Sequence, residues 1–256
     1  MSTLYLAWRS KYNTNNCTQN ETRWFPIGAL DYDKSESLYR FFYLKGAEKA
    51  RELAGFSALD AFPDFEKKYQ SDELFEFFKN RVPNRKRRDF SSIVERMDLE
   101  PNSADPVSIL SISGGTRQTD CLEIFPELEL SEDGYFTCKF FVHGSRFMSD
   151  YSNAKLKELQ VGDELKIAIE MNNPATGSAI QIQTKDDLAV IGYAPRYLLE
   201  DLKQMEQNPY EVKAHIAKVN LEPAPSNQRL LVSLSGKLPK TNSSMRAQEE
   251  FSALIH

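Results

Sequence analysis

The chain has 256 residues, 41% of them hydrophobic, and a formal net charge of −5. Its length fits two modest domains, and 16 Phe and 11 Tyr supply enough large apolar side chains for their cores. No stretch approaches the roughly 20 apolar residues of a membrane span, and the acidic balance argues against a protein that coats duplex DNA by bulk electrostatics.

The first half of the chain predicts a mixed α/β module. Alternating apolar residues predict strands at 3–8, 23–30, 38–44 and 121–127, and a polar, Asn-rich stretch at 10–22 predicts a loop. Helical spacing and capping residues predict four helices. These are 46–54 ending at Gly55, 72–82 capped by Ser71, 91–97, and 106–110 capped by Asp105.

An acidic, loop-like stretch, ELELSEDG at 127–134, marks the expected domain boundary. Beyond it the pattern becomes strand-rich, with strands expected at 135–144, 164–171, 178–183, 188–193, 211–220 and 229–236. Helices are expected at 154–159 and 195–205, and a polar tail at the end. We therefore expect an α+β protein of two domains, 1–130 and 131–256, the second a small β-barrel or rolled sheet with helices.

Motifs for catalysis are absent from the sequence. It contains no phosphate-binding G-x-x-x-x-G-K-[ST] loop, no G-x-S-x-G, no H-E-x-x-H and no kinase set. Gly114-Gly115 fits a turn, and His143, His215 and His256 are far apart, with no Cys or carboxylate at metal-ligand spacing. The sequence therefore predicts a protein that is not an enzyme and has no cofactor or metal.

The densest basic run, RVPNRKRR at 81–88, has two interpretations. Several cations in a turn between helices can hold phosphates, or the run can be an ordinary solvated surface. Phe75, Phe77 and Phe78 beside it have helical spacing, which favours a place in the core over a base-stacking surface.

The second half resembles the HIRAN domain in four pieces that follow in order. They are FFVHGSRFMSD, VGDELKIAIEMNNPATGSAIQI, LAVIGYAPRYLLEDL and the closing strands after Glu211. The resemblance implies a small β-barrel with helices. It also implies DNA binding, because the best-known members capture the free 3′ end of single-stranded DNA.

The resemblance assigns binding roles to five residues. Arg146 and Phe147 match a pair that contacts the backbone and stacks on a base, and Asn173 matches the Asn before the loop proline. Tyr193 and Arg196 match the polar and basic positions that flank the start of the last helix.

The loop departs from the family pattern, because Ala175 and Thr176 replace its Tyr and Asp. The change removes stacking worth about 1–3 kcal/mol per base and an acceptor for the terminal hydroxyl. Structural roles also stay open for the matching residues. Arg146 can pair with Asp150, Phe147 can be core, and Asn173 can simply start a turn; the other two, Tyr193 and Arg196, can pack and cap.

The first half resembles, more weakly, the N-terminal subdomain of HipA-type kinases. The similar pieces are RWFPIGAL, YRFFYLKGAEKA, LFEFFKNRVP and DPVSILSISGGTRQTDCLEIFP. The part resembled is a regulatory, partner-contacting module without the kinase core, and Thr116 stands where the family has an acid. The combination with a HIRAN domain is similar to an arrangement in bacterial proteins.

Two functions follow as hypotheses. One is a nucleic-acid-binding protein that recognises single-stranded DNA ends. The other is a regulatory protein that contacts a protein partner through 1–130 and uses its HIRAN domain as a scaffold. HIRAN domains elsewhere are fused to ATPases and zinc domains, but this sequence supports neither a hydrolase nor a zinc site.

The amino terminus and the cysteines predict a cytoplasmic protein without a membrane anchor. MSTLYLAWRSK lacks the basic region, apolar stretch and small-residue cleavage site of a secretory signal. Cys17, Cys121 and Cys138 are odd in number and scattered, so no disulfide framework is indicated.

Overall fold

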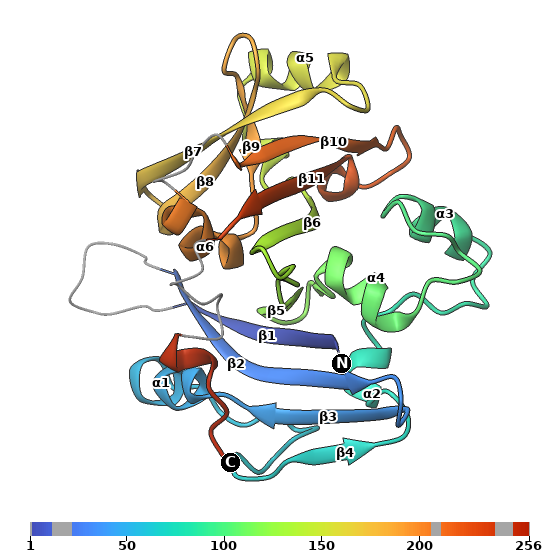
Figure 1. Ribbon diagram of the computed structural model, residues 1–256, viewed down its shortest axis with the longest axis vertical. Coiled ribbons are helices and arrows are strands. Elements are labelled where there is room, and N and C mark those ends of the chain that lie inside the picture. The colour runs from blue at the N-terminus through green and yellow to red at the C-terminus, as the bar shows by residue number, and fades with distance from the viewer. Residues whose placement is uncertain (1, 12–21, 206–210, 239–247, 256) are drawn as a thin grey trace. The chain divides into compact units, whose positions relative to one another are not determined.

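The computed structural model describes residues 2–11, 22–205, 211–238 and 248–255 (Figure 1). Contacts divide them into two units. The first holds the residues up to Arg87, residues 105–127 and the described carboxyl-terminal residues; the second holds 88–104 and the described part of 128–244. The change of unit after Glu127 lies close to the expected boundary, but two short segments lie with the opposite unit. The division into 1–130 and 131–256 stays a prediction for independently folding parts.

A five-stranded antiparallel sheet forms the first unit, in the order β4-β3-β2-β1-β5. Its strands are β1 (Ser2–Lys11), β2 (Thr22–Asp33), β3 (Leu38–Tyr43), β4 (Tyr69–Ser71) and β5 (Leu122–Pro126). The four strands expected in this half are present, and β4 is a short edge strand that the alternation did not predict. The Asn-rich loop falls mainly on residues 12–21, which lie outside the described residues.

In the first unit, one helix ends and another begins where a capping residue predicts. α1 (Lys45–Ala54) ends at Gly55, whose φ of +70° is the left-handed conformation that glycine adopts without strain. α4 (Pro106–Ser113) begins after Asp105, whose Oδ1 accepts hydrogen bonds from the backbone N–H groups of Val107 and Ser108.

The prediction of a helix at 72–82 is wrong, because only the short helix α2 (Glu76–Lys79) forms there. Ser71 belongs to β4 instead, and its Oγ accepts a hydrogen bond from the Glu73 backbone N–H at 3.1 Å. Tertiary packing overrides the helical pattern because the three phenylalanines surround Phe62, with ring centroids 5.2–6.2 Å from it. Phe78 is buried and Phe75 and Phe77 are partly buried, which confirms their predicted place in the core.

Arg81, the first residue of the basic run, is a structural residue. Its side chain is only 2% exposed, pairs with the Asp120 carboxylate and donates to the Gly115 carbonyl at 2.8 Å. Its guanidinium also lies 4.6 Å from the Phe77 ring centroid. Gly115 has a φ of +53°, and a Cβ there would lie 2.8 Å from Ile124 Cδ1, so this glycine serves a tight turn. Arg81 is therefore not part of an exposed phosphate-binding patch.

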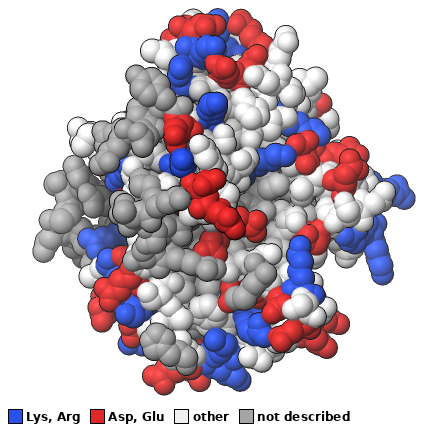
Figure 2. Space-filling view, viewed as in Figure 1, with Lys and Arg blue, Asp and Glu red and all other residues white. Residues whose placement is uncertain are grey.

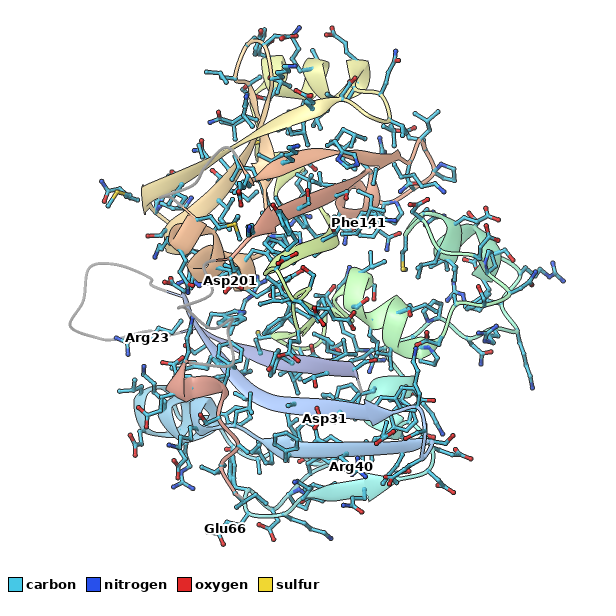
Figure 3. The ribbon with its side chains drawn as sticks, in the orientation of Figure 1. Arg23, Asp31, Arg40, Glu66, Phe141 and Asp201 are labelled. Carbon is cyan, nitrogen blue, oxygen red and sulfur yellow. The ribbon has the colours of Figure 1, made fainter. Side chains whose placement is uncertain are left out.

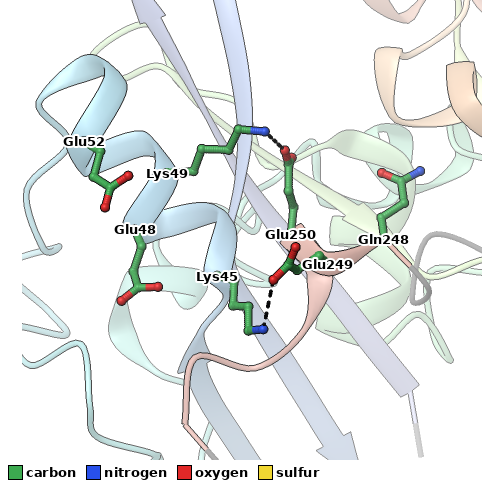
Figure 4. Close-up of a pocket in the computed structure, with 7 residues that line it drawn as sticks. All are labelled: Lys45, Glu48, Lys49, Glu52, Gln248, Glu249 and Glu250. Atoms are coloured by element: carbon green, nitrogen blue, oxygen red, sulfur yellow. Dashed lines mark hydrogen bonds and ion pairs between the residues drawn. The ribbon is translucent and has the colours of Figure 1, made fainter.

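The described carboxyl-terminal residues pack on the first unit. The prediction of a polar tail is therefore wrong for these residues. The short helix η7 (Glu249–Phe251) places the buried Phe251 ring edge-on to Tyr5, with centroids 5.0 Å apart. Figure 4 shows the ion pairs that join η7 to α1, Lys45 with Glu249 at 3.2 Å and Lys49 with Glu250. The shallow pocket between them is lined mostly by these paired charges.

A six-stranded antiparallel sheet forms the second unit, in the order β6-β11-β10-β7-β8-β9. Its strands are β6 (Tyr135–Phe141), β7 (Glu164–Asn173), β8 (Gly177–Thr184), β9 (Val190–Tyr193), β10 (Lys213–Val219) and β11 (Leu230–Lys237). All six strands expected in this half are present.

A small β-barrel or a rolled sheet was expected here, and the sheet does not close into a barrel within the described residues. Among the described residues, the edge strands of this sheet meet only at a backbone pair just beyond β6, in which His143 and Tyr193 exchange N–H···O bonds of 2.8 and 2.9 Å. Gly192 permits even this contact, because a Cβ there would lie 2.5 Å from the His143 carbonyl oxygen.

The helices of the second unit include those expected at 91–97, 154–159 and 195–205, with shifted bounds, and two short helices that were not predicted. The helices are α3 (Phe90–Glu95), η1 (Ser145–Phe147), α5 (Asp150–Glu158), η2 (Arg196–Leu198), α6 (Leu199–Gln204) and η5 (Ser226–Gln228), of which η1 and η5 are the two that were not predicted. The segment that contains α3 binds this unit through Asn220, whose Nδ2 donates to the carbonyls of Arg96 and Gln228 at 3.0 and 2.8 Å. Lys139 of β6 also pairs with Asp98 at 2.7 Å.

Basic and acidic side chains are interspersed on the face drawn in Figure 2, as the net charge of −5 allows. Within the described ranges, no helix is both long and apolar enough to cross a membrane.

Candidate nucleic-acid interface

The turn between β7 and β8 is organised by Asn173. Its Oδ1 accepts hydrogen bonds from the backbone N–H groups of Ala175 and Thr176, at 3.0 and 3.1 Å, and from Thr176 Oγ1 at 3.0 Å. An Asn side chain that accepts from the backbone two residues ahead is a typical turn former. Gly177 follows with a φ of +74°. The Asn-Pro frame is therefore intact, while Ala175 is exposed at the position of the family's tyrosine.

Arg196 holds this turn from the first position of η2. Its Nη1 donates to the carbonyl oxygens of Thr176 and Ser178 at 2.9 and 3.2 Å. The side chain is half-buried, and these two hydrogen bonds hold the turn in place. Arg196 acts first as a positioning residue for the loop.

Glu170 lies at the centre of the same network, although the sequence analysis did not single it out. Its Oε2 accepts from Asn173 Nδ2 at 3.0 Å and from Gln181 Nε2 at 3.2 Å. These partners meet because Glu170 faces Ala179 in the β7–β8 register, and that register bulges before Asn173 pairs with Gly177. A single acidic residue in an alternating strand gives no signal of such a network.

Tyr193 joins the network from β9. Burial raises the pKa of its phenol, and the nearby Glu170 carboxylate raises it further, while a hydrogen bond to Asn173 lowers it. The phenol is therefore protonated at neutral pH and can donate a hydrogen bond. Its ring lies against Gly144, where an added Cβ would be 3.4 Å from Tyr193 Cδ2.

Arg146 and Phe147 form an exposed pair on η1. The Phe147 ring is 71% exposed, so the core interpretation is wrong. The Arg146 guanidinium carbon lies 4.5 Å from the centroid of that ring, a distance typical of a cation–π contact. Arg146 forms no ion pair with Asp150, both of which the structure describes. η1 begins just after the His143–Tyr193 backbone pair, which places it beside β9.

The five predicted residues thus fall into two groups. Asn173, Tyr193 and Arg196 share one hydrogen-bonded network around the β7–β8 turn, with Glu170 at its centre. Arg146 and Phe147 present an exposed cation and an exposed aromatic ring on the neighbouring η1. This arrangement offers a ligand one phosphate contact and one stacking surface next to a rigid polar turn.

Metal binding has no support in the described part of the chain, which contains no group of three or more His, Cys, Asp or Glu placed to hold an ion. His143 takes part in the backbone pair and His215 lies in β10. His256 lies outside the described residues.

The family model of the HIRAN domain matches residues 135–238. The HIRAN domain is generally a DNA-binding domain. The resemblance of the second half is therefore supported, and that of the first half to HipA-type kinases stays a prediction. The matched range contains all five predicted binding residues as well as Glu170.

No curated protein matches the chain. Among solved structures, a crystal structure of a protein from Lactobacillus plantarum is 22% identical. The match covers 41% of this chain and 100% of that one, with a TM-score of 0.31.

Proposed function

We propose that this protein binds single-stranded DNA at a free 3′ end through its HIRAN domain, and that it has no catalytic activity of its own. The observation that carries the proposal is the exposed Arg146–Phe147 pair beside the hydrogen-bonded turn. A stacked aromatic and a nearby cation are the two elements that single-strand binding needs, since bases stack on the ring and phosphates pair with the cation.

The charge of the protein makes the proposed contact local. With a net charge of −5 and mixed charges on the surface in Figure 2, non-specific duplex binding is weak. One phosphate neutralised by Arg146 contributes at most about one unit to the slope of log affinity against log salt. The salt dependence should therefore be shallow, and an end that fits the turn should matter more than strand length.

The test is titration of a labelled single strand that has a free 3′ hydroxyl, compared with the same strand blocked by a 3′ phosphate. Phe147→Ala should weaken binding by about 1–3 kcal/mol and leave the salt slope nearly unchanged, because stacking releases few counterions. Arg146→Ala should weaken binding and flatten the slope by about one unit at most.

A matched control exists at the other end of β6. Lys237 lies 4.7 Å from the ring centroid of Tyr135, which is 48% exposed, so this pair has the same chemistry away from the turn. Tyr135→Ala and Lys237→Ala should leave DNA binding unchanged. If they weaken it as much as Phe147→Ala and Arg146→Ala do, binding is non-specific and the proposed site is wrong.

A regulatory, partner-contacting protein is the second candidate. The observation in its favour is the exposed Ala175, which supplies no stacking where the family has a tyrosine. Under this proposal residues 1–130 contact the partner, and wild-type protein binds neither form of the oligonucleotide at low salt.

A further inference from the structure

We propose that Glu170 selects the chemistry of the bound strand end by accepting a hydrogen bond from a terminal 3′ hydroxyl and excluding a terminal phosphate. The inference rests on the proposed DNA-binding function and assigns to Glu170 the acceptor role that Thr176 leaves unfilled.

The position of Glu170 is the first argument. A carboxylate within the proposed polyanion site repels phosphate at that point, because like charges a few ångströms apart destabilise each other. A carboxylate is compatible with such a site only if the part of the ligand that faces it is a neutral or hydrogen-bond-donating group. On a nucleic-acid strand, the terminal hydroxyl is such a group.

The hydrogen-bond arrangement is the second argument. A carboxylate has roughly four acceptor positions, and two amide donors, from Asn173 and Gln181, share Oε2. The Tyr193 phenol also hydrogen-bonds to Glu170. Three donors therefore fix the orientation of the side chain, and roughly one acceptor position is left for a ligand. The carboxylate is also only partly buried, so a ligand can reach it.

The neighbouring side chains are the third argument. Tyr193 hydrogen-bonds to Glu170 through its protonated phenol, and Arg196 anchors the turn that carries Asn173. The acceptor and the side chains that hold it therefore belong to one hydrogen-bonded network, and a site that discriminates between small terminal groups requires such support. A hydrogen bond to an ionised acceptor is roughly twice as strong as one to a neutral acceptor, so its loss should be measurable.

The experiment compares strands that end in a 3′ hydroxyl, a 3′ hydrogen or a 3′ phosphate. Wild type should bind the hydroxyl form most tightly. Glu170→Gln keeps the size of the side chain and an acceptor oxygen but removes the charge. We expect it to reduce the preference for hydroxyl over hydrogen by about tenfold and to bind the 3′ phosphate form more tightly than wild type does.

Glu164→Gln is the matched control, since Glu164 lies on the same strand and pairs with Lys185, outside the network. Thermal unfolding checks that each variant is folded. Glu170→Asp provides a second variant that keeps the charge, and it should still exclude the 3′ phosphate.

The outcomes separate the two proposals. If wild type prefers the hydroxyl end and Glu170→Gln keeps the full preference, Glu170 is only a brace for the turn, and DNA binding stands. If wild type binds no strand, or binds all three ends equally, the proposed end recognition fails and the role of Glu170 fails with it.

Discussion

At the scale of single residues, Asp201 is the most unusual group in the protein (Figure 3). Its side chain lies on α6, is 1% exposed, and has no hydrogen-bond partner for either carboxylate oxygen among the described residues. Burial raises its pKa to about 7, and Glu200 adds to the rise. The buried Cys138 thiol on β6 is affected in the same way: burial and then Asp201 raise its pKa to about 12.

The first prediction concerns stability against pH. Because the folded pKa of Asp201 is raised, the folded state holds a proton that the unfolded state releases above its own pKa near 3.8. Stability from this group is therefore fully present below about pH 4 and is lost as the pH rises to about 7. Asp201→Asn, which stays neutral, should raise the free energy of unfolding at pH 8 by about 2–4 kcal/mol.

Denaturant unfolding at pH 5 and pH 8 measures this difference. Glu200→Gln is the control, because the exposed Glu200 side chain contributes only the smaller part of the shift. An Asp201→Asn variant as pH-sensitive as wild type would contradict the prediction.

At the scale of elements, the β7–β8 hairpin shows how far the sequence predicts the candidate site. The Asn173-Pro174 frame follows from local turn chemistry. The family resemblance singled out Phe147, and its exposure became evident only in the structure. The loop-holding bonds of Arg196 and the place of Glu170 depend on which residues face each other across β7, β8 and η2. Strand register and bulges set those contacts, and alternation alone does not determine them.

The second prediction tests the turn. Asn173→Ala removes the acceptor of two backbone N–H bonds and one hydroxyl bond, each worth about 1 kcal/mol. Amide hydrogen exchange at Ala175 and Thr176 should therefore accelerate. Asn172→Ala, at the exposed neighbouring position, should leave these two exchange rates unchanged.

The contact between β9 and the end of β6 gives the third prediction. Gly192→Ala would place a Cβ 2.5 Å from the His143 carbonyl oxygen, and such overpacking costs about 1–3 kcal/mol. Gly162→Ala shares a positive φ, of +93°, but its Cβ meets no atom within 4 Å. Gly192→Ala should therefore lower the unfolding temperature more than Gly162→Ala does. Equal losses would mean that backbone strain, and not the close approach, decides the cost.

At the scale of the whole molecule, the sequence predicts the mixed α and β content and the positions of the strands along the chain. It predicts less well which segments belong to which unit. Apolar runs and alternation predicted all the strands of the two sheets except the short edge strand β4. These patterns gave no sign that Phe251 packs on Tyr5 or that Asn220 binds the Arg96 carbonyl. Such contacts join segments far apart in the chain, and no local pattern encodes them.

The fourth prediction concerns these distant segments. A fragment of residues 1–130 lacks Phe251 and Ala253, which pack on Tyr5 and pair with Leu44. It should unfold at a lower temperature than the same fragment mixed with an excess of a peptide covering 245–256, because the peptide binds only the folded form. The same peptide carrying Phe251→Ala should stabilise the fragment less. A fragment that gains nothing from the intact peptide would show that 1–130 is already complete.

The exchange of segments between the units also has a consequence during translation. Domains generally fold as units while the chain emerges, but residues 248–255 emerge only after all of the second unit has been synthesised. Until then Tyr5 and Phe125 have no Phe251 to cover them. The first unit is therefore completed only after the second has been synthesised, although most of its residues are made first.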